Sequence, residues 1–382
     1  QQDTAVDSFG GDFAVVHPPT EHPRGSPGWG IGVNGGDWGR GARRPHFQKE
    51  CIVEVWHDTL PRYYEVLRLA GVKMDRNWNF NWAAIEPEQG KFDFAPTDRE
   101  LAEHRKYGIE LAPVLGCDFT INYPGFPEWA KGQSREHVIS KEHFLPGYIP
   151  PAETWAAYCR AVMARYQGDI RIWEFLNEPS GFINADEYME LLKVTYEVAR
   201  KVAPEIQVIG PCPTGDALVP RVYEWSQEII KAGGEKYLDG FSYHPYGAGT
   251  DYQRGQFFAA TTMIRSIRSW LTNKELPLYN TECFQLANEK YDRCDRWDAS
   301  TGLRHYLITL GNGVRFCASF CEYEFFKDRF NAHQGIIRPW VHESVPAPVS
   351  VALNNLSHQL RGTTKAEVLE LNGFIRSYVF SG

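Results

Sequence analysis

Two glutamates stand at the ends of apolar runs, where an ionisable side chain is costly unless it is paired or functional. Glu178 follows the run 172–176, and Glu282 follows the shorter run 277–281. They are about 100 residues apart, which corresponds to three strand–helix units of a parallel α/β protein. The spacing therefore predicts that the fourth and seventh strands of one sheet bring both carboxyl groups to the same edge.

Paired carboxyl groups are what cleavage of a glycosidic bond requires. One carboxylic acid protonates the leaving oxygen while the other carboxylate attacks carbon or activates water. A separation of ~5–5.5 Å goes with retention of configuration, and ~6.5–9.5 Å leaves room for water and gives inversion. Proximity also separates the two pKa values, so that one group stays protonated near neutral pH. The alternative is a pair of buried structural carboxylates held by arginine, but their place at one edge favours catalysis.

The elements that must position these groups follow a regular rhythm. Between residues 28 and 320, short apolar runs alternate with longer amphipathic ones, which is typical of βαβ units and a parallel sheet. We expect helices at 154–166, 185–202 and 349–360, with Thr154 and Asn184 as the N-caps of the first two. The expected strands are 30–34, 72–76, 110–115, 170–176, 206–210, 240–243, 278–280 and 314–318.

Eight strands with intervening helices predict an α/β fold, a (β/α)8 TIM barrel of ~250 residues plus insertions. The alternative, a doubly wound open sheet, lacks the Gly-rich motif that would support it. Residues 1–27 are expected to form an extended arm, 28–362 the barrel and 363–382 a β-hairpin. A lone hairpin is marginal, so we expect a short accessory β element formed by the chain termini, or a small β-domain. Three long connections after strands are expected to line a cleft, namely 116–151, 283–299 and 320–346.

The residues around both glutamates resemble those of clan A glycoside hydrolases. These are (β/α)8 enzymes with the acid/base on strand four and the nucleophile on strand seven. The Asn-Glu-Pro of the clan matches residues 177–179. The resemblance implies that Glu178 is the acid/base, that Asn177 hydrogen-bonds the 2-hydroxyl of the sugar, and that Glu282 is the nucleophile.

Two further segments carry the resemblance. Arg76, followed by Trp82 and the segment 85–94, is similar to the strand-two segment of several clan A families, in which the arginine supports the nucleophile. His244 and Tyr246 match a His-x-Tyr segment found in families such as 39, where both side chains reach the nucleophile or the substrate. Within the clan the chain is most like family 39, with families 5 and 42 close.

One segment departs from the pattern. Many clan members place a Trp at the end of strand eight as the floor of a sugar subsite, but residues 320–326 contain none. Phe320 or Tyr323 is the expected platform here. Four tryptophans are further candidates for stacking on sugar or, equally, for packing loops: Trp78, Trp82, Trp129 and Trp297.

Three other polar residues have structural alternatives. Glu174 lies four residues before Glu178 on the same strand and is expected to point into the barrel as a structural group. Glu86 precedes a proline at a turn and is expected to hold a loop. His244 could be a core histidine or a metal ligand, but it has no second ligand at metal spacing, so we expect no metal and no cofactor.

These observations predict a retaining glycoside hydrolase acting on β-linked sugars. A transglycosylase using the same site and a non-catalytic carbohydrate-binding barrel are the alternatives. The expected partner is a carbohydrate, because a net charge of -8 without a basic aromatic-rich stretch argues against nucleic acid, and no run is long enough to span a bilayer. The chain begins Gln1-Gln2 without Met, which favours a secreted or periplasmic protein over a cytoplasmic one. The sequence carries no signal for the oligomeric state.

Overall fold

A computed structural model describes the barrel and the C-terminal hairpin. It covers residues 12–17, 64–77, 79–116, 125–137, 147–213, 220–245, 257–283, 295–319, 337–340, 343–346, 348–361, 363, 365–372 and 375–382. Among these residues, no helix combines the length and the apolar character needed to cross a membrane.

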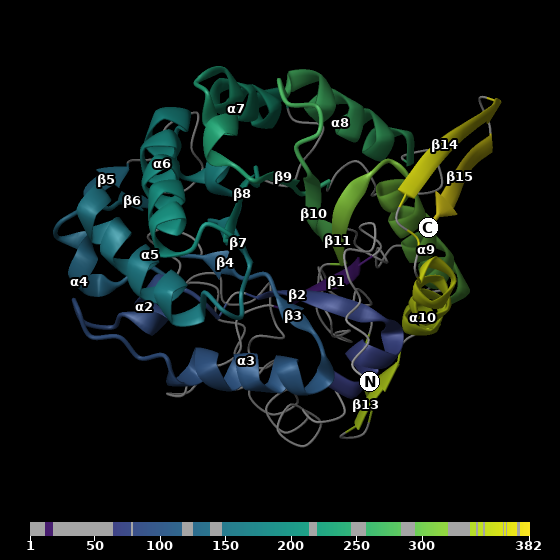
Figure 1. Cartoon of the computed structure of the whole chain (residues 1–382), viewed down its shortest axis with the longest axis horizontal. Helices are drawn as coiled ribbons and strands as arrows, with labels where there is room; N and C mark the ends of the chain where they lie inside the picture. The colour runs from purple at the N-terminus through teal and green to yellow at the C-terminus, as the bar shows by residue number, and fades with distance from the viewer. Residues whose placement is uncertain are drawn as a thin grey trace.

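One parallel sheet forms the centre of the fold (Figure 1). Its strand order is β3-β2-β1-β11-β10-β9-β8-β7-β4. Since β3 and β4 are two pieces of one run, the same stretch of chain pairs with β2 at its start and with β7 at its end. This double pairing closes the sheet into a barrel. The strands are β1 Asp12–His17, β2 Val72–Asn77, β3 Glu110–Leu111, β4 Val114–Leu115, β7 Ile172–Phe175, β8 Gln207–Pro211, β9 Gly240–Tyr243, β10 Leu278–Cys283 and β11 Val314–Ser319.

Helices surround the strands on the outside of the barrel (Figure 1). Residues 64–70 are also helical and precede β2. The labelled helices are α2 Trp82–Ile85, α3 Ala95–Tyr107, α4 Glu128–Lys131, α5 Ala152–Tyr166, α6 Ala185–Val202, α7 Pro220–Lys231, α8 Phe257–Trp270, α9 Asp295–Gly311 and α10 Pro348–Leu360, with short 3-10 turns η3 Pro179–Gly181 and η4 Gly234–Tyr237.

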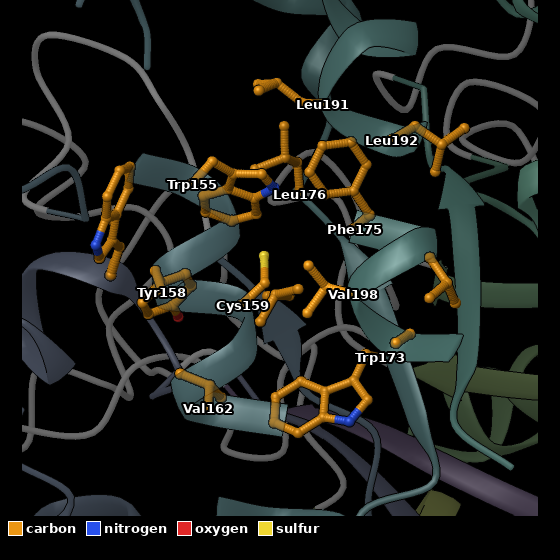
Figure 2. Packing of buried hydrophobic residues seen from close by; sticks show 14 of the residues in the cluster. Trp155, Tyr158, Cys159, Val162, Trp173, Phe175, Leu176, Leu191, Leu192 and Val198 are labelled. Atoms are coloured by element: carbon orange, nitrogen blue, oxygen red, sulfur yellow. The ribbon is translucent and has the colours of Figure 1, made fainter. Parts of the chain in front are cut away.

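The core between the barrel wall and α5 and α6 is rich in aromatic side chains (Figure 2). Trp155 and Trp173 are fully buried, and burying a large apolar side chain contributes ~1.5–3 kcal/mol. Trp155 also donates its indole N–H to Thr195 Oγ1 at 2.8 Å, which ties α5 to α6. This packing holds β7, the strand that leads into Glu178, against two helices.

The N-terminus differs from the expectation. Residues Asp12–His17 form β1, which pairs with β11 on one side and β2 on the other. The first barrel position is therefore filled from within the stretch 1–27 that was expected to be an arm, so the prediction of 30–34 as first strand is wrong. Residues 30–34 themselves lie outside the described part of the chain. The other seven strands lie where the sequence predicts them, with ends shifted by a few residues.

The predicted N-cap is confirmed for α6 and is wrong for α5. Asn184 caps α6 with a capping box, because its side chain accepts from the Glu187 amide while the Glu187 carboxylate accepts from the Asn184 amide. Thr154 is not a cap, since α5 begins two residues earlier, after Pro151. The prolines before Ala152 end the extended segment there and the helix follows at once.

The C-terminal hairpin consists of β14 Lys365–Asn372 and β15 Ile375–Ser381, which form their own two-stranded sheet. It contacts α9, and Asn312 Nδ2 donates to Tyr378 Oη at 3.3 Å. The described part of the N-terminus lies in the barrel wall, so the two termini do not share a sheet there. Two further hairpins lie in the long connections, β5 Arg135–His137 with β6 Gly147–Ile149, and β12 Ile337–Trp340 with β13 Glu343–Pro346.

Candidate active site

Glu178 lies just beyond the end of β7, on a segment with an unusual backbone. Leu176 has a φ of 63° and Glu178 a φ of 46°, in the left-handed region that non-glycine residues seldom adopt. Such conformations cost free energy and cluster at functional sites. The turn leaves the Glu178 side chain 27% exposed, so this carboxyl group can reach a ligand.

Glu282 lies near the end of β10 and is 6% exposed. One of its carboxylate oxygens lies within 4.8 Å of one from Glu178, although the two strands are separated in the sheet by β8 and β9. The barrel thus brings together the two glutamates that the sequence singles out.

Arg76 on β2 connects the acidic residues inside the barrel mouth. Its guanidinium is fully buried and donates to Glu174 Oε2 at 2.5 Å, to Glu282 Oε2 at 2.9 Å and to Asn177 Oδ1 at 2.8 Å. Burial lowers the pKa of Arg76, but the neighbouring anions led by Glu174 outweigh this effect and raise it. The predicted contact between Arg76 and Glu282 is confirmed, and it supports an ionised Glu282.

Glu174 is a buried structural carboxylate, as the sequence predicts. Besides Arg76, it accepts a hydrogen bond of 2.7 Å from Thr281 Oγ1. Burial alone would raise the pKa of Glu174, but the positive charges of Arg76 and His244 hold it below its usual value. Glu174 therefore stays ionised and fixes the arginine that contacts Glu282.

His244 follows β9 and joins the two sides of the site. Its Nδ1 lies 2.9 Å from Glu178 Oε1, and its Nε2 lies 3.1 Å from Cys212 Sγ and 3.9 Å from Glu282 Oε2. Burial lowers the pKa of His244, but Cys212, Glu282 and Glu178 outweigh it and raise the pKa well above its ordinary value. These distances place His244 beside both Glu178 and Glu282, while its contact with substrate stays a prediction.

Cys212 is a member of the site that sequence reasoning missed. It follows β8 with a φ of 47° and is fully buried. Burial raises the pKa of its thiol, and Glu174 adds to the effect, which favours the protonated form. The only signal in the sequence is its place at the carboxyl end of the fifth strand, the edge where barrel active sites lie.

The prediction that Trp82 contacts the sugar is wrong. It is fully buried, packs edge-on against Phe126 and Trp129, and donates its N–H to Glu86 Oε2 at 2.7 Å. Trp129 is half-buried and donates to the Glu86 carbonyl at 2.8 Å, so it also packs this loop. Glu86 accepts from the Gly90 amide at 2.7 Å as well, which confirms it as a loop-holding residue.

Several predicted site residues lie outside the described part of the chain. They are Tyr246, Phe320, Tyr323 and Trp78, and the side chain of Trp297 is likewise not described. Their roles as sugar contacts stay predictions.

Three groups of described side chains place possible metal-ligand atoms within 4.8 Å of one another, and one of them, Glu178, His244 and Glu282, lies at the barrel mouth. In the group at the mouth, the Glu178 and His244 atoms already share a hydrogen bond of 2.9 Å, and the Arg76 cation contacts Glu282. A second cation there would have to displace a proton and face that guanidinium. The other two groups are Glu174, Cys212 and His244, and Asp75, Glu100 and His104.

Comparisons with known proteins agree with this geometry. Residues 52–198 match the family model of glycoside hydrolase family 42, described as β-galactosidase. The segment includes Arg76, Asn177 and Glu178 and is less than half of the chain. The β-galactosidase BbgII of Bifidobacterium bifidum is 30% identical over 132 residues, which is 33% of this chain and 19% of that protein. The chain thus spans about a fifth of this relative's length.

Solved structures of glycoside hydrolases share the fold. A family 39 enzyme from Bacteroides cellulosilyticus WH2 aligns with a TM-score of 0.66 at 19% identity, covering 97% of this chain and 68% of that one. A GH5_18 protein from Streptomyces cattleya has a TM-score of 0.60 at 12% identity, with 80% and 75% covered. A GH39 β-xylosidase from Caulobacter crescentus has a TM-score of 0.58 at 18% identity, with 86% and 70% covered. With paired glutamates at the ends of strands four and seven, the chain is similar to clan A glycoside hydrolases in its fold and in the sequence of residues 52–198.

Proposed function

We propose that this chain hydrolyses β-glycosides with retention of configuration, using Glu178 as acid/base and Glu282 as nucleophile. The observation that carries the proposal is the approach of the two carboxylates to within 4.8 Å. This supports the ~5–5.5 Å separation of retaining glycosidases over the ~6.5–9.5 Å that inversion needs.

The surroundings of the two glutamates support their different roles. Glu282 is 6% exposed and receives a hydrogen bond from the buried Arg76 cation, which stabilises the ionised form that a nucleophile requires. Glu178 is more exposed and contacts a histidine, so it can exchange a proton with a leaving group and with water.

The reaction proceeds in two displacements. A Glu282 oxygen attacks the anomeric carbon while the bond to the leaving oxygen breaks and that oxygen takes the proton of Glu178. In the second step, Glu178 removes a proton from water, the water oxygen attacks the anomeric carbon, and the ester to Glu282 breaks. The net change is one glycoside and one water converted to a free sugar and an alcohol, with both glutamates restored.

We propose β-galactosides as the first substrates to test, because the matching family model and the Bifidobacterium relative both carry that name. Neither covers enough of this chain or of the relative to decide the sugar. A panel of aryl β-glycosides that also contains glucosides, xylosides and mannosides gives the glycone directly.

The test compares the wild type with Glu178→Ala and with the control Glu190→Ala. Glu190 lies on α6 in an exposed ion pair with Arg135, and such pairs contribute ~0–1 kcal/mol. We expect Glu178→Ala to lose activity mainly on poor leaving groups, by about 10²–10⁴-fold, while the control keeps wild-type rates. Addition of azide should restore turnover of activated substrates in this variant.

Two results would oppose the proposal. Equal loss on good and poor leaving groups in Glu178→Ala would remove the acid/base role. No cleavage of aryl glycosides or of polysaccharides, together with measurable sugar binding, would favour a non-catalytic carbohydrate-binding barrel instead.

A further inference from the structure

The thiol of Cys212 lies at the end of a line of polar contacts that reaches the acid/base. Its Sγ is 3.1 Å from His244 Nε2, and the opposite ring atom, Nδ1, is 2.9 Å from Glu178 Oε1. Both Cys212 and His244 are fully buried. The three residues come from the ends of three neighbouring strands, β8, β9 and β7.

The backbone of Cys212 is shaped to place this thiol. Among the described residues, only Leu176, Glu178 and Cys212 combine a non-glycine side chain with a positive φ. A strained backbone persists only where the surroundings enforce it, and such residues gather at active sites. Cys212 thus shares its unusual conformation with the proposed acid/base.

The surroundings of the thiol are polar, unlike those of a cysteine that only fills space. Besides His244, Sγ lies 3.8 Å from Arg76 Nη2 and 3.9 Å from Thr281 Oγ1. A thiol can donate one hydrogen bond and accept another, although weakly. Cys159 on α5 lies instead within the aromatic core, where its thiol has Thr195 as a hydrogen-bond partner.

We propose that Cys212 is a positioning residue that keeps a proton on His244 Nδ1, directed at Glu178. This inference rests on the proposed glycosidase function and deepens it. With a neutral imidazole, the S–H donates to Nε2, so the ring proton must sit on Nδ1 and donate to Glu178 Oε1. With a charged imidazole, the Nε2–H donates to sulfur, and Nδ1 still donates to Glu178.

A hydrogen on His244 Nδ1 determines which carboxyl oxygen of Glu178 carries the acidic proton. Because Oε1 accepts from Nδ1–H, the acidic proton of Glu178 belongs on Oε2, where it can pass to the leaving oxygen. With the hydrogen on Nε2 instead, Nδ1 would be an acceptor and would compete with the leaving oxygen for that proton. The carboxylate of Glu282, 3.9 Å from Nε2, favours this unproductive arrangement.

The charged and titratable groups around His244 influence which ring nitrogen carries the proton. In the described residues, Glu178 faces the ring from beyond β7, Cys212 from beyond β8 and Glu282 from β10. Glu174 also faces the ring, with a carboxylate oxygen within 4.8 Å of a His244 nitrogen, and it contacts Arg76 at 2.5 Å. The Glu282 carboxylate favours a proton on Nε2, whereas the S–H donor of Cys212 favours Nε2 as an acceptor.

The experiment measures the proton on His244 directly and the acid catalysis separately. Nitrogen-15 NMR of labelled protein reports whether Nδ1 carries hydrogen, and the His244 signals are assigned by their loss in His244→Asn. Rates are measured with aryl β-glycosides of good and poor leaving groups. The variants are Cys212→Ala, Cys212→Ser, and Cys212→Gly, which tolerates the positive φ if the alanine variant folds poorly. Cys159→Ser is the control for exchanging a buried thiol.

We expect Nδ1 to be protonated in the wild type and in Cys212→Ser at every pH from 6 to 9. In Cys212→Ala or Cys212→Gly, Nδ1 should lose its hydrogen at the alkaline end while Nε2 keeps it. The rate on poor leaving groups should fall about 10-fold, a fraction of the 10²–10⁴ available from acid catalysis. Rates on good leaving groups, and all rates of Cys212→Ser and the control, should stay within about 3-fold of wild type.

Two outcomes would overturn the inference. A proton that stays on Nδ1 without the thiol would show that Cys212 does not set the ring state. An equal loss of rate on all leaving groups would assign the thiol to packing. If the wild type cleaves no glycoside, the proposed function fails, while the NMR measurement still decides whether Cys212 controls His244.

Discussion

Replacement of Arg76 by methionine should destabilise the barrel by an amount that depends on pH. Methionine fills similar space, so the main loss is the cation that contacts Glu174 at 2.5 Å and Glu282 at 2.9 Å. Removing one partner of a buried ion pair costs ~3–5 kcal/mol, because the remaining charge is left in a medium that solvates it poorly. We therefore expect the free energy of unfolding at pH 7 to fall by about this amount.

The pH dependence follows from the sign of the shift at Glu174. In the wild type its folded pKa lies below the ordinary value of 4.5, so the stabilisation is present above that pH and is lost as the pH falls through the folded pKa. Without Arg76, burial dominates and the folded pKa rises above 4.5, so the variant loses stability as the pH increases. The difference between wild type and Arg76→Met should thus grow from pH 4 to pH 7.

Urea unfolding followed by tryptophan fluorescence at several pH values measures this difference. The double variant Arg76→Met/Glu174→Gln should recover part of the lost stability at pH 7, because one buried charge is removed, but it should not recover activity. A loss below ~1 kcal/mol, or a loss that does not change with pH, would refute the reasoning.

Three further predictions concern neighbouring features. His244→Asn should lower the free energy of unfolding most below pH 6.5 and least at alkaline pH, because the folded pKa of His244 is raised and its stabilisation is lost as the pH rises through that value. Equal losses in urea unfolding at pH 6 and at pH 9 would contradict this. Thr281→Val should cost ~1–3 kcal/mol in urea unfolding, because the buried Glu174 carboxylate loses a donor at 2.7 Å. Gly116→Ala should cost ~2–4 kcal/mol by thermal or urea unfolding, because φ is +81° and a Cβ would clash with the indole ring of Trp155. The control Gly132→Ala, with open space around it, should change stability by less than ~0.5 kcal/mol.

Residues whose role depends on their place at a strand end were predictable from the sequence. Glu178 and Glu282 follow apolar runs, and parallel strands deliver their carboxyl ends to one mouth, so their proximity follows from order and spacing alone. Arg76 and Glu174 were predictable as charges inside the barrel, since a buried ion requires a partner of opposite charge.

Other features depend on contacts between distant segments. Cys212 acquires its contacts from three strands and from a left-handed backbone, neither of which appears in local composition. Trp82 lies in a segment with a matching pattern, yet its burial depends on residues such as Phe126 and Trp155 that fold back over it. The position of β1 was missed because a short parallel strand in a barrel wall has no alternating pattern to distinguish it from other apolar runs.

As the proposed nucleophile, Glu282 forms a covalent bond to the sugar during the reaction. The most direct test is incubation with a 2-deoxy-2-fluoro β-glycoside bearing a dinitrophenyl leaving group, on the glycone that the substrate panel identifies, followed by peptide mass spectrometry. One sugar should be attached to the peptide containing Glu282, and the labelled protein should regain activity as the ester hydrolyses. A label on another carboxylate, or an unlabelled enzyme that releases product with inverted configuration, would contradict it.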